Sequence, residues 1–109
     1  MLKPNILPYQ RHAIMCCGKS CGGNLPLFRY LKKRLADRGL YTDESTTVRV
    51  NKAGCLGVCC EGPIMVVYPE GVWYCQLDEV AIDRIIEEHF IGHQVVEDLC
   101  FHGLMDREV

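Results

Sequence analysis

The pattern of apolar positions predicts a strand and then a helix in the first part of the chain. Residues 12–15 form a short apolar run that leads directly into Cys16, which indicates a buried strand. After a glycine-rich segment, apolar residues recur at helical spacing and form one stripe: Leu25, Phe28, Leu31 and Leu35. Asn24 is a suitable N-cap for this helix, Pro26 suits its first turn, and Gly39 is a fitting end.

Three further strands are predicted in the middle of the chain. Residues 46–51 alternate, with Val48 and Val50 on one side, as in a half-buried strand. Residues 64–68 and 72–75 are rich in residues that favour strands and are joined by Pro-Glu-Gly, which indicates a hairpin.

A second long helix follows the hairpin. Asp78 is a suitable N-cap, Gly92 a fitting end, and the apolar stripe between them consists of Ala81, Ile85, Ile86 and Phe90. One more short helix is expected at residues 94–99, followed by a loose tail.

The order of these elements, β-α-β-β-β-α, defines the expected fold. A strand, a crossover helix and a second strand favour a parallel pair, and the hairpin then extends the sheet in the antiparallel sense. This order matches an α/β thioredoxin-like sandwich with a mixed four-stranded sheet. We expect an N-terminal arm at residues 1–11, one domain at residues 12–99 and a C-terminal tail at residues 100–109.

Length and charge narrow the class of protein. The 109 residues suit one domain with one core, and a net charge of −2 without a basic tract gives no reason to expect nucleic acid. No apolar run approaches the roughly 18 residues of a membrane helix, and residues 1–11 lack the apolar stretch of a signal peptide. We therefore expect a cytoplasmic protein without a membrane partner, in a compartment where thiols stay reduced.

Eight cysteines are the most unusual feature of the composition. In a reducing compartment they indicate metal ligation or redox chemistry rather than disulfides. Six of them lie in or beside two glycine-rich loops, at residues 17–23 and 53–63: Cys16, Cys17, Cys21, Cys55, Cys59 and Cys60. If the first two strands are parallel neighbours, both loops leave the same end of the sheet, where open α/β sheets usually place their sites.

The spacing of these cysteines favours an iron–sulfur cluster. Four thiolates in two pairs can hold zinc, or two irons bridged by sulfides. Zinc sites favour tight Cys-x2-Cys pairs, which are absent, whereas the wider pairs Cys16/Cys21 and Cys55/Cys59 suit a larger cluster. Cys17 stays an alternative to Cys16, because its spacing from Cys21 equals that between Cys55 and Cys59.

The residues around these pairs resemble a known family. The sequences HAIMC at residues 12–16, AGCLGVC at residues 53–59 and GPIMVVYPEGVWY at residues 62–74 resemble the thioredoxin-like 2Fe-2S ferredoxins. That family is related to the small 2Fe-2S subunit of respiratory NADH dehydrogenase. The resemblance covers residues 12 to about 99. It implies cluster ligands at four positions: Cys16, Cys21, Cys55 and Cys59.

The resemblance also implies a function. It indicates a small electron carrier, not an enzyme, which holds a 2Fe-2S cluster, exchanges electrons with redox partner proteins and forms a homodimer. Four residues separate the first two ligands, as in the NADH dehydrogenase subunit, whereas free-standing ferredoxins usually have a longer loop there.

Three other functions remain open at this point. A thioredoxin-like thiol oxidoreductase would normally carry a Cys-x-x-Cys motif, which is absent. The other two are a cluster-bearing subunit of an NAD-linked oxidoreductase complex and a structural zinc-binding thioredoxin-like module. No glycine motif for nucleotides is present, so we do not expect the chain itself to bind flavin or nicotinamide.

Features outside the loops have structural and functional interpretations. Cys75 and Cys100 are interpreted as small buried apolar residues. The scattered histidines are assigned structural or surface roles: His12, His89, His93 and His102. The first helix carries a basic stripe: Arg29, Lys32, Lys33, Arg34 and Arg38. The last helix carries an acidic stripe: Asp83, Glu87 and Glu88. These stripes are either solvated faces or surfaces that steer a charged redox partner.

The second arm of the hairpin, residues 72–75, is expected at the edge of the sheet. Trp73 and Tyr74 are large for an exposed edge and are favoured at interfaces. We expect this edge to pair two copies of the chain. The alternative is that Trp73 packs under the last helix and the C-terminal segment covers the edge.

Overall fold

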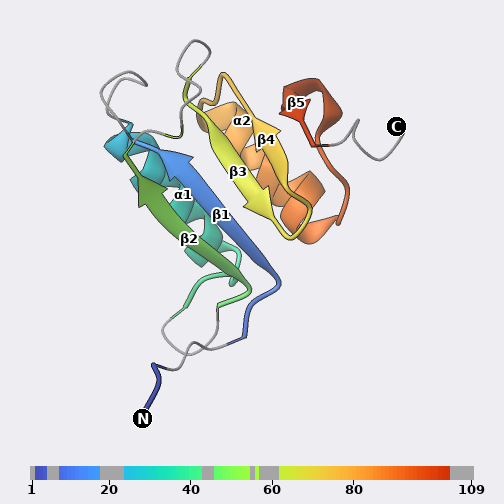
Figure 1. Cartoon of the computed structure of the whole chain (residues 1–109). Helices are drawn as coiled ribbons and strands as arrows, with labels where there is room; N and C mark the ends of the chain where they lie inside the picture. Colours follow the sequence, from blue (N-terminus) through green and yellow to red (C-terminus); the bar gives the residue numbers. More distant parts are fainter. Residues whose placement is uncertain are drawn as a thin grey trace.

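A five-stranded mixed sheet with helices on one side organises the part of the chain that the computed structural model describes (Figure 1). That part comprises residues 2–4, 8–17, 24–42, 46–54, 56 and 62–103. In chain order the elements are strand β1 (Arg11–Cys16), helix α1 (Leu25–Asp37), strands β2 (Val48–Ala53), β3 (Met65–Tyr68) and β4 (Val72–Tyr74), helix α2 (Glu79–Arg84) with its π-helical continuation η2 (Ile85–Ile91), the 3-10 turn η3 (Glu97–Leu99) and strand β5 (Cys100–His102). The strand order across the sheet is β2-β1-β3-β4-β5.

Strand β1 pairs with a neighbour on each side. It runs parallel to β2, with Cys16 beside Ala53, and antiparallel to β3, with Met15 beside Met65. Strands β3 and β4 form the predicted hairpin. Because β1 and β2 are parallel, both finish at the same end of the sheet, which confirms the prediction from the strand-helix-strand order (Figure 1).

Helices α1 and α2 cover one face of the sheet and bury alternate strand residues (Figure 1). The predicted helical residues Phe28, Leu31 and Leu35 are buried, and Leu25 is partly buried against them. The strand residues on this face share the core with them: Ala13, Met15, Val48, Val50, Met65, Val67 and Tyr74. Among the described residues, no helix is both long enough and apolar enough to cross a membrane.

The helix ends agree with the sequence except at Asn24. Gly39 follows α1 with a φ of +73°, a conformation that favours glycine. The Asp78 side chain caps α2 by accepting a hydrogen bond from the Ala81 N–H at 2.8 Å. Asn24 precedes α1, but its side chain makes no capping hydrogen bond. Here the proline in the first turn, with its fixed φ, supplies the start signal.

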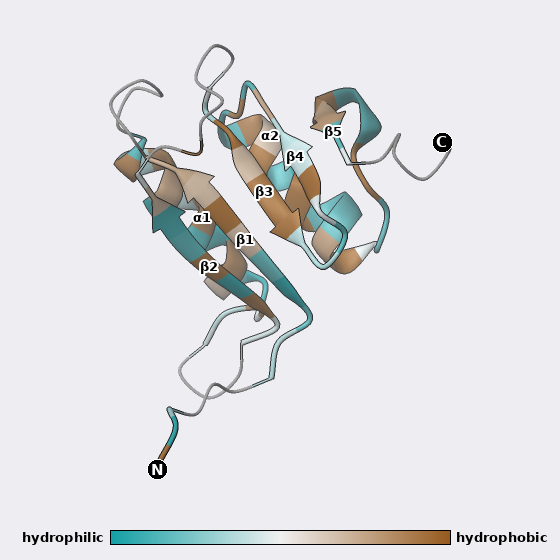
Figure 2. Cartoon of the chain, in the orientation of Figure 1, coloured by the Kyte–Doolittle hydropathy of each residue, from teal (hydrophilic) through white to brown (hydrophobic). Residues whose placement is uncertain are grey.

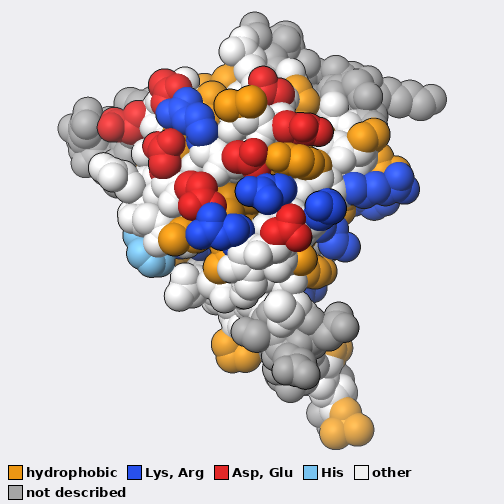
Figure 3. Space-filling model, turned by 180° about the vertical axis from the view of Figure 1, so that it is seen from behind, with side chains coloured by type: hydrophobic (Ala, Val, Ile, Leu, Met, Phe, Trp, Pro, Cys, Tyr) orange, Lys and Arg blue, Asp and Glu red, His pale blue; other side chains and the backbone are white. Residues whose placement is uncertain are grey.

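The basic and acidic stripes of the two long helices lie against each other. Arg34 pairs with Asp83 (Nε–Oδ1, 3.0 Å), and Arg38 pairs with Glu87. Figure 3 shows this face from behind, with basic and acidic side chains side by side. These four side chains link the two helices and are still 34–45% exposed, so they also form part of a solvated face. Steering of a redox partner by the stripes stays a prediction.

Strand β5 is the main difference from the predicted fold, because it makes the sheet five-stranded rather than four-stranded. It pairs antiparallel with β4, with Trp73 opposite His102 and Tyr74 opposite Cys100. The prediction that β4 is an edge strand is therefore wrong, and the alternative, that the C-terminal segment covers this edge, is confirmed. Three residues are too few to show an alternating pattern in the sequence.

The C-terminal segment contains less helix than the sequence predicts. Of the short helix expected at residues 94–99, only Glu97–Leu99 is helical, as a 3-10 turn. The division into an arm, a domain and a tail stays a prediction, and β5 lies within the expected tail.

The face of the sheet opposite the helices carries a smaller apolar group. It lies towards the viewer in Figure 2, where the strands show brown segments between paler ones. Trp73 does not lie beneath the last helix. It packs in a small cluster with buried Cys16 and Ile64, and its ring meets Phe101 of β5 edge to face, with centroids 6.4 Å apart.

Candidate metal centre

Three backbone segments meet where β1 and β2 finish, at what we call the cysteine end of the sheet. The Cys17 N–H donates to the Ala53 carbonyl at 2.8 Å, which continues the parallel ladder beyond β1. The Cys16 N–H donates to the Ile64 carbonyl at 2.9 Å and so ties this end to the segment before β3. The residues that begin the two cysteine loops therefore lie side by side.

The side chain of Cys16 is buried at this end, with 1% of its surface exposed. Its thiol donates a hydrogen bond to the Gly54 carbonyl at 3.1 Å. It belongs to an apolar cluster separate from the main core: Cys16, Ile64, Leu56, Trp73 and Cys75. The sulfur therefore occupies a position that is shielded from water and contacts the backbone at the end of β2.

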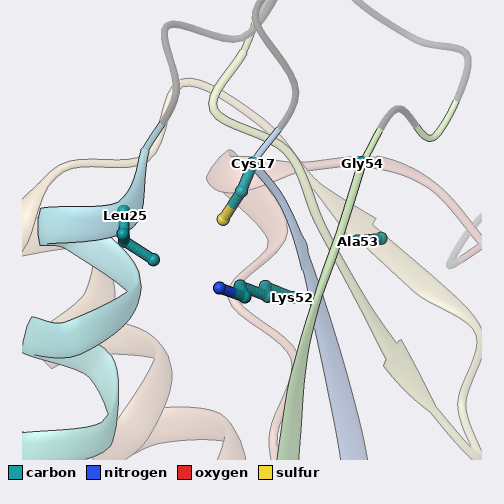
Figure 4. Close-up of a pocket in the computed structure, with 5 residues that line it drawn as sticks. All are labelled: Cys17, Leu25, Lys52, Ala53 and Gly54. Atoms are coloured by element: carbon teal, nitrogen blue, oxygen red, sulfur yellow. The ribbon is translucent and has the colours of Figure 1, made fainter.

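Cys17 points the other way, because successive residues of an extended chain alternate between faces. It lines a hollow of about 440 Å³ together with four other residues: Leu25, Lys52, Ala53 and Gly54. In Figure 4 the Cys17 sulfur and the Lys52 ammonium both point into this space, between the start of α1 and the end of β2. Burial raises the pKa of the Cys17 thiol, Cys16 raises it further, and Lys52 offsets part of this increase.

Only part of the predicted ligand set can be placed. Cys16 is described, whereas Cys21, Cys55 and Cys59 lie outside the described residues, and so does Cys60. Four cysteines lie within the described residues, and two of them, Cys17 and Cys100, carry free thiols. Within the described ranges, no group of three or more His, Cys, Asp or Glu side chains is arranged to hold a metal ion.

The residues that are placed fit an iron–sulfur cluster. Thiolates are soft ligands that suit iron–sulfur sites. In the sequence, Leu56 lies between Cys55 and Cys59, and its side chain packs in the same cluster as Cys16. A described residue of the second loop is thus adjacent to the first predicted ligand, as a cluster shared by both loops requires.

Comparison with known proteins identifies the family. The sequence model of the thioredoxin-like 2Fe-2S ferredoxins matches residues 5–89. The chain is also 34% identical over 96 residues to a 2Fe-2S ferredoxin from Clostridium pasteurianum, which covers 83% of this chain and 94% of that relative. The chain belongs to this family. The chain is 46% identical to a 2Fe-2S ferredoxin from Aquifex aeolicus (strain VF5) over 54 residues, which are 50% of this chain and 48% of that relative.

Solved structures agree with the fold. The crystal structure of the wild-type thioredoxin-like 2Fe-2S ferredoxin from Aquifex aeolicus matches with a TM-score of 0.74 and 27% identity, over 87% of this chain and 99% of that one. A chain of an NAD+-reducing NiFe hydrogenase matches with a TM-score of 0.58 and 18% identity, over 84% of this chain and 16% of the other. The second similarity shows the fold alone. Together they confirm the predicted thioredoxin-like α/β fold class.

Membership of the family establishes the cofactor and the broad function. The protein carries a 2Fe-2S cluster and is a small electron-carrier ferredoxin. The predictions of cofactor and function are therefore confirmed, whereas the four cysteine ligands stay a prediction.

Sequence reasoning missed the neighbours of the two adjacent cysteines. Lys52 lies two residues after Val50 on β2, so alternation alone could have placed it on the helical face beside Cys17. Trp73 was assigned to an interface at a sheet edge, yet it packs beside Cys16. No local pattern could have shown that contact, because it depends on the pairing of β1, β3 and β4.

Proposed function

We propose that Cys16, Cys21, Cys55 and Cys59 ligate the cluster, and that this ferredoxin passes single electrons between redox partner proteins without catalysing a reaction itself. The observation that supports this ligand set is the adjacency of Cys16 and Ala53 at the ends of two parallel strands. The hydrogen bond from the Cys16 thiol to the Gly54 carbonyl also supports it, because it brings this sulfur to the start of the second loop.

The surroundings of Cys16 suit a low-potential carrier. A bound 2Fe-2S cluster accepts and returns one electron, at about −400 mV in plant-type ferredoxins. The side chains of Ile64, Leu56 and Trp73 exclude water from one side of Cys16. Low solvent exposure disfavours the added negative charge of the reduced cluster, so this apolar group is expected to keep the potential low.

Absorption spectra of aerobically purified cysteine variants test the ligand set. Cys21→Ala and Cys55→Ala should abolish or severely destabilise the visible charge-transfer bands, because each removes a ligand. Cys100→Ala is the matched control, since Cys100 lies on β5 and contacts the main core. A normal spectrum for Cys55→Ala, or a colourless Cys100→Ala protein, contradicts the proposal.

The geometry supports Cys16 over Cys17 as the first ligand. Cys16 faces Leu56 of the second loop, whereas Cys17 faces Leu25 and Lys52 on the helical side. Cys17→Ala should therefore keep a normal spectrum and Cys16→Ala should not. The reverse result assigns the ligand to Cys17.

We also propose that the ferredoxin is a homodimer, as the family resemblance implies, and that it pairs through the sheet face opposite the helices. The edge of β4 is covered by β5, so the pairing surface must differ from the one expected from the sequence. Tyr68, which pairs with His12, and Phe101, whose ring contacts Trp73, are 46% and 38% exposed on this face. Light scattering at micromolar concentration should give a dimer, which Phe101→Lys weakens and Val80→Lys, on α2, does not. A monomeric wild type refutes the dimer.

The proposed compartment is the cytoplasm. Thiolate ligands need a reducing environment until the cluster is assembled, and the cytoplasm supplies one. Fractionation of cells followed by detection of the protein with an antibody tests this assignment, and recovery outside the cytoplasmic fraction contradicts it.

A further inference from the structure

A hydrogen-bonded network is buried between the helices and the sheet, towards the end where β1 begins (the Arg11 end). His89, in η2, has 0% of its surface exposed. Its Nδ1 lies 2.7 Å from the Tyr74 hydroxyl, and its Nε2 lies 2.9 Å from a Glu70 carboxylate oxygen. The same oxygen accepts a hydrogen bond from Arg11 Nε at 2.7 Å. None of these four residues is a proposed ligand of the cluster.

One arrangement of protons satisfies every hydrogen bond in this network. The Val96 N–H donates to the Tyr74 hydroxyl oxygen at 3.1 Å, so the hydroxyl proton points to His89 Nδ1. Glu70, paired with Arg11, is ionised and accepts from His89 Nε2–H. His89 is therefore neutral with its proton on Nε2. All buried side-chain nitrogen and oxygen atoms of the described residues then have partners.

The network also holds the C-terminal segment, residues 94–103. Val96 is 1% exposed, and its N–H donates the hydrogen bond that the Tyr74 hydroxyl oxygen accepts. Beyond Val96 the segment forms η3 and the short strand β5, whose pairing with β4 is irregular, with a register shift between Trp73 and Tyr74. The Cys75 N–H adds a hydrogen bond to the Leu99 carbonyl at 3.2 Å. This segment covers the β4 edge, which would otherwise be open to pairing.

We propose that His89 is a pH-sensitive latch whose protonation releases residues 94–103 from the edge of β4. A proton on Nδ1 places a second donor against the Tyr74 hydroxyl, which already accepts from Val96. The hydroxyl proton then loses its acceptor, and a positive imidazole is buried near Arg11. Both changes weaken the contact with Val96, and a three-residue strand has few other hydrogen bonds to retain it.

The groups around His89 set the direction of the pH dependence. They are Glu70 from the turn after β3, Arg11 from β1, Tyr74 from β4, and His93 after η2. Burial lowers the pKa of His89 and outweighs the hydrogen bond with Glu70, which raises it; the charges of Arg11 and His93 lower it further. Opening of the segment returns the pKa towards its ordinary value near 6.5. The closed form is thus fully favoured above about pH 6.5 and loses stability as the pH falls through the lower pKa of the closed form.

A second acid-sensitive contact on the same segment must be separated from this one. Arg84 forms two hydrogen bonds with Asp98, at 2.8 and 2.9 Å. The hydrogen bond from Arg84 lowers the pKa of Asp98 below its ordinary value, so this ion pair persists to a more acidic pH than the His89 contact. An Asp98→Asn variant therefore separates the effect of the Arg84–Asp98 ion pair from that of the His89 contact.

The position of Trp73 provides a direct signal. It is the single tryptophan of the sequence and contacts Phe101 of β5. On titration of the holoprotein from about pH 8 to about pH 5.5, with the visible absorption of the cluster recorded in parallel, Trp73 emission should shift to longer wavelength. Over the same range, amide exchange in residues 94–103 should accelerate by up to about tenfold after correction for the intrinsic rate, while β1 stays protected.

Variants assign the transition to His89. His89→Gln keeps a hydrogen-bond donor and an acceptor, but glutamine does not titrate between about pH 8 and about pH 5.5. This variant should therefore lose both the shift of Trp73 emission and the faster exchange of residues 94–103. Tyr74→Phe removes only the hydroxyl, so residues 94–103 should exchange rapidly already at about pH 8, without the pH dependence. His12→Gln replaces a histidine of β1 that bonds to Asn51, and it should behave as the wild type, as should Asp98→Asn.

Several outcomes overturn the proposal. It is wrong if the transition persists in His89→Gln, disappears in Asp98→Asn, or coincides with loss of the cluster absorption. If His89→Gln does not fold, Tyr74→Phe decides, and a wild-type transition in that variant rejects the role of the His89–Tyr74 contact.

Discussion

The two ends of the sheet are stabilised by different kinds of contact. At the cysteine end, the described contacts of Cys16 and Cys17 are made largely with backbone carbonyls. At the Arg11 end, the side chains of Arg11, Glu70 and His89 bond directly to one another inside the protein. The Arg11 end is thus completed by the protein's own side chains. With the proposed ligand set, the cysteine end is completed by thiolate ligation, which couples cluster binding to folding.

Removal of the cluster should have the largest effect, and only at the cysteine end. In apoprotein prepared with an iron chelator, amide exchange at Cys16, Cys17 and Gly54 should accelerate by about 100-fold relative to the holoprotein. Strand β3 should change by less than about threefold, because its partners β1 and β4 remain in place. Equal protection of the cysteine end in both forms contradicts the proposed division between the two ends.

Glu70→Ala should damage the Arg11 end instead. It leaves the Arg11 guanidinium, 11% exposed, and the His89 Nε2–H without their shared acceptor. Loss of one partner from a buried ion pair is strongly destabilising. Because Glu70 itself is 29% exposed, we expect a moderate loss of about 2 kcal/mol in the free energy of unfolding by urea.

The control and the pH dependence of Glu70→Ala sharpen this comparison. Glu88→Ala breaks an exposed pair with Arg84 on the same helix and should change stability little. Burial raises the pKa of Glu70, but hydrogen bonds from Arg11 and His89 outweigh it and lower the pKa overall. The contribution of Glu70 is therefore present above the ordinary carboxyl pKa and is lost as the pH falls through the lower folded value. If the free energies of unfolding of the wild type and Glu70→Ala still differ in acid, this assignment is wrong.

The starts of the two helices offer a smaller contrast. Asp78 makes a capping hydrogen bond to α2, whereas Asn24 makes none to α1. Asp78→Ala should therefore lower the free energy of unfolding by about 1 kcal/mol, and Asn24→Ala by less. Thermal unfolding of both holoproteins measures the difference, and a larger loss for Asn24→Ala shows that the cap was misassigned.

Local patterns were sufficient for the elements that carry their own signals. The alternation at Val48 and Val50, the N-cap at Asp78 and the positive φ at Gly39 each follow from neighbouring residues. The parallel order of β1 and β2 then predicted that the two cysteine loops begin side by side, which the pairing of Cys16 with Ala53 confirms.

Long-range pairing accounts for what the sequence could not show. The contacts of His89 with Tyr74 and Glu70 span 15 and 19 residues, and that of Arg11 with Glu70 spans 59. No repeat or motif links these positions, so a structural role for His89 could be expected but not its partners. Strand β5 escaped prediction for a similar reason, since it is short and is defined by its pairing with β4.

Lys52 provides the finest test of the cysteine end, through the reduction potential rather than stability. Its ammonium points into the hollow that Cys17 lines, on the side of the sheet away from the Cys16 thiol (Figure 4). A cation favours the more negative reduced cluster, so Lys52→Gln should lower the potential. For an exposed charge screened by water and salt, a change on the order of 10–20 mV corresponds to a separation of about 10 Å. Lys33→Gln is the matched control, because Lys33 lies on α1 beside Asp37 and its side chain is 74% exposed. Redox titrations of the wild type and of the two variants, all with the cluster bound, measure the difference.

Equal potentials for Lys52→Gln and Lys33→Gln mean that Lys52 has no particular electrostatic influence on the cluster. A higher potential for Lys52→Gln contradicts the predicted direction of the charge effect.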